Sequence, residues 1–118
     1  MNTHDNNAQT PSTLVIAAHF GEVQGIIHHF DLERIPSMSP AMGSLWGGQI
    51  SDNNIKIDSS ATSLLVAITG EGGANALRYT SYLLGRLDQQ ISEIINVGVA
   101  GAIDQSLDYG ELVWIRSV

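Results

Sequence analysis

The sequence has 118 residues, enough for one small domain with its own core. Its 5 Lys and Arg against 12 Asp and Glu give a net charge of −7, so nucleic acid and anionic membrane surfaces are disfavoured as partners. It contains no cysteine, which excludes disulfides and thiolate metal sites.

The chain begins with a polar stretch, residues 1–12, that lacks the basic start and apolar core of a signal peptide. We expect a disordered leader there, followed by one domain over residues 13–118. No apolar run approaches membrane-spanning length. We therefore expect a soluble, cytoplasmic protein.

The first structured elements are a strand and a helix. The apolar run 13–18 predicts a buried strand that ends in a polar loop. Residues 22–30 predict an amphipathic helix, whose core face carries Val23, Ile26, Ile27 and Phe30. Glu22 lies in its first turn, where a carboxylate also compensates the helix dipole without any chemical role.

The middle of the chain alternates short apolar runs with turns. Pro36 and Pro40 end the helical region, and the runs 45–50 and 55–58 predict an antiparallel hairpin. The run 63–68 predicts the next strand.

The second half predicts a helix between two strands. The helix covers residues 74–87, and its core face is predicted to carry Leu77, Leu83, Leu84 and Leu87. The run 94–97 then predicts a strand buried on both faces of a parallel sheet, which completes a βαβ unit. Leu112 to Ile115 predicts a last strand.

A glycine loop lies between the strand 63–68 and the helix 74–87, with Gly70 and Gly72 in it. Such a loop before a helix invites a dinucleotide-binding interpretation. Two features oppose it: the third fingerprint position is Asn75, and Val97-Gly98 stands where an acidic residue should bind the ribose.

A second small-residue loop follows the strand 94–97. Gly98 and Gly101 carry no Cβ, so a flat ligand can lie directly on the peptide planes at the carboxyl end of the strand. The loop predicts the floor of a site, or a tight turn without a ligand. The adjacent His28 and His29 point about 100° apart on a helix and cannot share a metal ion, so we expect no metal site.

Three segments in order, 17–23, 69–76 and 96–102, resemble the nucleoside phosphorylase/nucleosidase superfamily. The segment 103–113 is similar to the family's continuation into the next strand. The resemblance implies an α/β fold: a three-layer αβα domain with a central mixed, twisted sheet, here about its N-terminal half. It also implies a homo-oligomer, a dimer in the family.

The match looks closest to the hydrolases of the family, futalosine hydrolase and methylthioadenosine/S-adenosylhomocysteine nucleosidase. Glu22 falls where these enzymes carry the glutamate that activates water, and Asn96 falls where many phosphorylases carry a phosphate-binding arginine. Val99 replaces the serine of the methylthioadenosine nucleosidases and looks more like futalosine hydrolase, an enzyme of menaquinone biosynthesis. The alternatives are a methylthioadenosine nucleosidase and a phosphate-dependent phosphorylase.

The resemblance assigns roles to a small set of residues. Glu22 would be catalytic, His19 and Phe20 would flank the ribose or its 5′ substituent, and Val99, Ala100 and Gly101 would supply a backbone surface for base and ribose. The substrate would be a small-molecule purine nucleoside, with no metal or organic cofactor.

The family's purine-protonating aspartate and its Met-Glu ribose clamp fall beyond position 118. We therefore expect this chain alone to be inactive, and the non-enzyme alternative is a truncated nucleoside-binding or assembly remnant.

Overall fold

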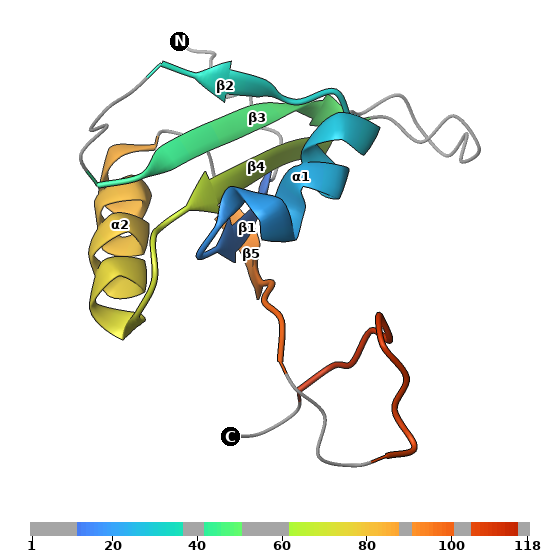
Figure 1. Cartoon of the computed structure of the whole chain (residues 1–118). Coiled ribbons are helices and arrows are strands. Elements are labelled where there is room, and N and C mark those ends of the chain that lie inside the picture. The colour runs from blue at the N-terminus through green and yellow to red at the C-terminus, as the bar shows by residue number, and fades with distance from the viewer. Residues whose placement is uncertain (1–11, 37–41, 51–61, 88–90, 101–104, 116–118) are drawn as a thin grey trace, which may run out of the picture.

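The computed structural model describes residues 12–36, 42–50, 62–87, 91–100 and 105–115. These residues form one five-stranded sheet and two helices (Figure 1). The strands are β1 (Ser12–Ala17), β2 (Glu33–Ile35), β3 (Ser44–Ile50), β4 (Thr62–Ile68) and β5 (Ile91–Asn96), and the helices are α1 (Phe20–His29) and α2 (Gly73–Arg86).

The strand order in the sheet is β2-β3-β4-β1-β5. β4 and β5 pair with β1 in parallel, whereas β3 pairs antiparallel with β4 and β2 pairs antiparallel with β3. The predicted βαβ unit is therefore confirmed as β4–α2–β5, with β1 between its two strands. The sheet is mixed, as expected.

Each face of the sheet carries its own apolar cluster, because successive side chains of a strand point to opposite faces. On the α1 side, Val15 and Val66 pack with Val23 and Ile27. On the α2 side, the buried cluster consists of Leu14, Leu45, Leu65, Ala67, Tyr79 and Leu83. The predicted three-layer αβα architecture is thus confirmed, with one helix on each face of the sheet (Figure 1).

The two helices lie close to their predicted positions, but the core face of α2 was predicted only in part: Leu83 is buried and Leu87 packs against the core as predicted. Tyr79 and Leu83 are the buried residues of α2, whereas Leu77 is 70% exposed and Leu84 46% exposed. Leu84 points about 100° away from Leu83 around the helix, so the sheet buries only one of them. In α1 the prediction holds for Val23 and Ile27, which are buried.

The predicted hairpin is only partly accounted for. Its first strand is β3, but its second, residues 55–58, lies outside the described residues. β3 instead pairs with β4 and with the unpredicted β2, whose three residues are too few to show a periodic pattern. The leader, residues 1–11, is also outside the described range.

Two predictions about the last third of the chain are wrong. β5 was expected to be buried on both faces, yet it is the edge strand and Ile94 is 46% exposed. Leu112 to Ile115 form no strand, and their side chains are 54% to 87% exposed. A strand exists only with a hydrogen-bonded neighbour, and no other described segment pairs with these residues. Neither described helix is long and apolar enough to span a membrane.

Candidate active site

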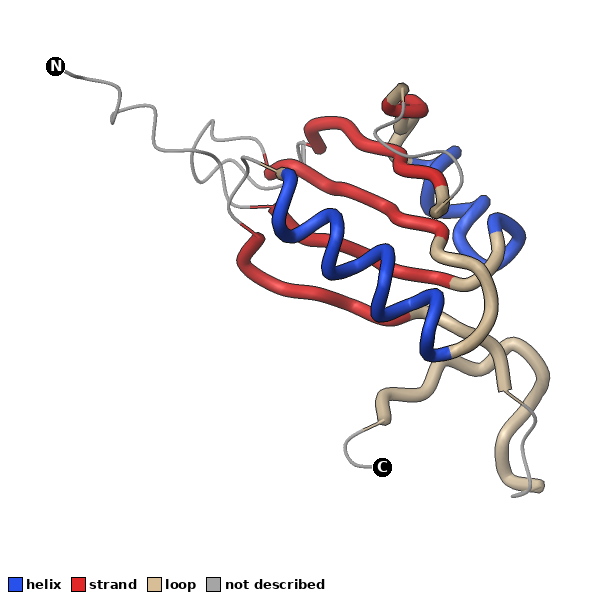
Figure 2. The backbone as a smooth tube through the Cα atoms, turned by 90° about the vertical axis from the view of Figure 1, so that its left-hand side faces the viewer, coloured by secondary structure: helices blue, strands red, loops and turns tan. Residues whose placement is uncertain are grey.

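The carboxyl ends of the three parallel strands lie at one edge of the sheet, where loops continue the chain (Figure 2). Backbone hydrogen bonds extend the ladder into these loops: Thr69 N–H donates to the Ala17 carbonyl at 2.9 Å, and Gly70 N–H donates to that of Ala18 at 3.1 Å. Val97 N–H donates to the Ile16 carbonyl at 2.9 Å. The loops after β4 and β5 are therefore hydrogen-bonded to β1 and to the residue that follows it.

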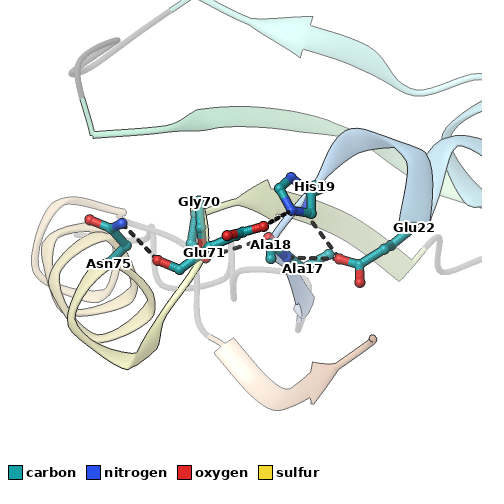
Figure 3. Close-up of polar contacts among 8 residues, drawn as sticks. Ala17, Ala18, His19, Glu22, Gly70, Glu71 and Asn75 are labelled. Atoms are coloured by element: carbon teal, nitrogen blue, oxygen red, sulfur yellow. Dashed lines mark hydrogen bonds and ion pairs between the residues drawn. The ribbon is translucent and has the colours of Figure 1, made fainter. Parts of the chain in front are cut away.

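Glu22 is held at this edge by the backbone just before its own helix. Its Oε1 accepts hydrogen bonds from the N–H groups of Ala18 and His19, both at 3.1 Å (Figure 3). These bonds satisfy backbone donors at the start of α1. They form a capping box, in which the carboxylate at the third helical position, Glu22, accepts a hydrogen bond from the backbone of the N-cap residue, His19. The carboxylate therefore has one oxygen committed to the fold.

The other carboxylate oxygen of Glu22 faces the loop after β5. A Cβ placed on Gly98 would lie 3.9 Å from Oε2, so these two residues adjoin across the ends of β1 and β5. No hydrogen bond of Oε2 occurs within the described ranges. A carboxylate fixed through one oxygen and open at the other can orient a water molecule and accept its proton.

His19 and Glu71 join two of the loops. His19 Nε2 lies 2.7 Å from Glu71 Oε2, although the two residues are 52 positions apart in sequence (Figure 3). Both side chains are mostly exposed, so this contact stabilises the fold little. Its consequence is positional: the imidazole is held over the carboxyl ends of β1 and β4.

Two glycines of the glycine loop have positive φ. Gly70 and Gly72 have φ of 85° and 91°, a region that residues with a Cβ rarely adopt. Gly72 is the N-cap of α2, and Thr69 Oγ1 donates to the Gly70 carbonyl at 3.0 Å. The loop thus turns sharply from β4 into α2.

The remaining predicted site residues do not form a cluster with Glu22 and His19. Phe20 packs on Trp46 of β3, with ring centroids 5.6 Å apart, and is 37% exposed. Val99 is 85% exposed, Ala100 is exposed as well, and Gly101 lies outside the described residues.

Two residues that contact the predicted site residues, Trp46 and Glu71, were not identified from the sequence. Trp46 contacts Phe20, and Glu71 contacts His19, from segments distant in sequence. No local pattern signals either contact, because each depends on the order of strands in the sheet. The contacts to Ala18 and His19 that fix Glu22 are local, and the spacing of a capping box could have indicated the second of them.

Comparison with known proteins adds one finding about the fold. The sequence matches no protein-family model and no curated protein. Among solved structures, the fold is similar to a mutant of Helicobacter pylori MTA nucleosidase (MTAN), crystallised with 5′-methylthioadenosine in its active site. The TM-score is 0.57 at 22% sequence identity, over 85% of this chain and 37% of the MTAN chain. This chain therefore shares the fold of part of that protein and spans little more than a third of its length.

Proposed function

We propose that this chain carries the water-activating part of a purine nucleoside N-ribosyl hydrolase, futalosine hydrolase-like in its substrate. One observation carries the proposal: the Glu22 carboxylate is fixed through Oε1, while its Oε2 lies beside Gly98 and accepts no hydrogen bond from the described residues. The shared fold with MTAN supports the reaction class. Val99 supports a 5′ substituent other than methylthio, by the resemblance described above.

In this reaction Glu22 Oε2 would accept a proton from water while the water oxygen bonds to the anomeric carbon. The N-glycosidic bond breaks, its electron pair goes to the base, and an acid protonates the departing purine. By the resemblance, that acid comes from beyond position 118. The proposed activity therefore needs such an acid in addition to Glu22.

The competing reaction is phosphorolysis, and the two reactions give different products. The full protein should release base from futalosine, or from methylthioadenosine, at the same rate with and without phosphate, and the sugar product should be free. An absolute need for phosphate, with a ribose 1-phosphate product, would exclude the hydrolase. No base release under either condition would favour the nucleoside-binding remnant.

A paired substitution tests the role of the Glu22–Gly98 contact. Gly98→Ala would place a methyl group 3.9 Å from Glu22 Oε2, an ordinary contact for the fold. If water binds at Oε2 as proposed, this methyl group crowds it, and we expect turnover to fall at unchanged stability. Gly25→Ala, where a Cβ meets nothing within 4 Å, is the control and should leave turnover unchanged. Equal rates for both variants would place the attacking water elsewhere.

A further inference from the structure

An open pocket of about 390 Å³ lies at the same edge of the sheet, but towards β3 and β2. It contains neither Glu22 nor Gly98. Its walls come from the ends of β1 and β4, the start of β3, the strand β2 and the first turn of α2. The lining residues that matter below are Arg34, Met42, Ser44, Ile68 and Asn75.

Arg34 gives this pocket a cation without a counter-ion. The chain has 5 Lys and Arg against 12 acidic residues, yet within the part that the structure describes Arg34 has no hydrogen-bond or ion-pair partner. The acidic side chain beside the adjoining glycine loop, Glu71, is already paired with His19. A guanidinium offers five N–H donors in a planar fork that suits carboxylate and phosphate oxygens.

Two further groups make the pocket favourable to an anion. Ser44 is half-buried, and its hydroxyl has no partner among the described residues, so it can donate to a ligand. Arg78 does not line the pocket, but it donates to Oδ1 of the lining residue Asn75, so a second positive charge lies next to a wall residue. Asn75 is held in place at both ends, because its Nδ2 also donates to the Glu71 carbonyl at 2.8 Å.

Part of the remaining wall is apolar, beside the polar Thr69. Met42 and Ile68 line it, and Gly43 between them has no room for a side chain. A Cβ on Gly43 would lie 2.4 Å from the Ile68 carbonyl oxygen and 2.8 Å from the Tyr79 ring. A ligand here would therefore meet a cationic end and a small apolar surface within one pocket.

We propose that this pocket binds the carboxylate or phosphate group of a small molecule, with Arg34 as the charged contact and Ser44 as a second donor. The ligand class follows from the fork of Arg34, the free hydroxyl of Ser44 and the apolar wall beside them. The proposal does not require the hydrolase, because neither Glu22 nor Gly98 lines the pocket, although Ala18 and Gly70 belong to both regions.

The test uses three probes: inorganic phosphate, benzoate, and the neutral benzamide. Binding is followed through the backbone amide NMR signals of Gly43, Ser44 and Gly70 at constant ionic strength. We expect saturable shifts with at least one anion and none with benzamide, and the tighter anion identifies the preferred group. Absence of saturable shifts with both anions, or equal binding of benzamide, would overturn the proposal.

Variants separate a specific contact from general charge attraction. Arg34→Gln should weaken anion binding about tenfold or more, because hydrogen bonds to charged groups are the stronger class. Ser44→Ala should weaken it about threefold. Arg86→Gln removes the same charge from the last turn of α2, where Arg86 lies over the Tyr82 ring, and should leave binding unchanged. Equal losses of anion affinity in Arg34→Gln and Arg86→Gln would show that general positive charge, and not a specific contact with Arg34, attracts the anion.

The outcome is distinguishable from that of the proposed hydrolase. Glu22→Gln should leave anion binding unchanged, since Glu22 does not line the pocket. Anion binding without base release would retain this inference and reject the hydrolase. Base release without anion binding would do the reverse.

Discussion

Replacing Glu22 by alanine should destabilise the fold, apart from any effect on chemistry. The substitution removes an oxygen that accepts two backbone N–H groups at 3.1 Å, and helix-start contacts of this kind contribute about 0.5–2 kcal/mol. Because Glu22 is half-buried, we expect a loss of about 1–2 kcal/mol in the free energy of unfolding. For a domain of this size, that lowers the melting temperature by about 5 °C or more.

The assay is urea denaturation of the 118-residue chain followed by circular dichroism. Glu22→Gln retains an acceptor oxygen, so its free energy of unfolding should fall by less than half as much as that of Glu22→Ala. The control is Gln24→Ala, an exposed position on the same helix, which should change little. Faster amide exchange at Ala18 and His19 in Glu22→Ala would locate the effect. Equal stability of wild type and Glu22→Ala would show that these two hydrogen bonds do not hold Glu22 in solution.

Three other predictions concern stability and association. Gly43→Ala should cost about 2 kcal/mol or more in denaturation experiments, because its Cβ would lie 2.4 Å from the Ile68 carbonyl oxygen, whereas Gly25→Ala should stabilise α1 by about 0.5–1 kcal/mol. Burial raises the pKa of the Tyr79 hydroxyl above its ordinary 10.0. The contribution of Tyr79 to the free energy of unfolding should therefore be constant below that pH and fall as the pH rises above it. Tyr79→Phe should flatten this fall in urea titrations. The chain should self-associate in light scattering through its exposed apolar residues, and Trp114→Ser, at a residue 77% exposed, should reduce the effect; a monodisperse wild type would contradict it.

Much of the fold could be predicted because three elements carry clear apolar patterns. β1 and β4 are continuous apolar runs, and α1 shows its buried Val23 and Ile27 at helical spacing. β2 could not be predicted, since three residues cannot display a period. Leu112 to Ile115 have strand-like composition, yet composition cannot supply the neighbouring strand that a ladder requires.

The loops of the candidate site could be predicted in part, but their contacts could not. Gly98 was singled out because it follows a run that predicts a strand, and ligands bind at the carboxyl ends of parallel strands. Glu22 was singled out only by the family resemblance. The pairing of His19 with Glu71 spans 52 residues and depends on β1 and β4 being neighbours. Arg34 was overlooked for the same reason, because β2 itself was not foreseen.

The measurement that tests the central claim most directly compares base release by the full protein with that of its Glu22→Gln variant. The amide keeps the shape of the side chain but cannot accept a proton from water. We expect turnover to fall by about 10²–10⁴-fold while the dissociation constant for the nucleoside stays nearly constant. A variant that turns over at close to the wild-type rate would contradict the account, and would leave Glu22 only its hydrogen bonds to Ala18 and His19.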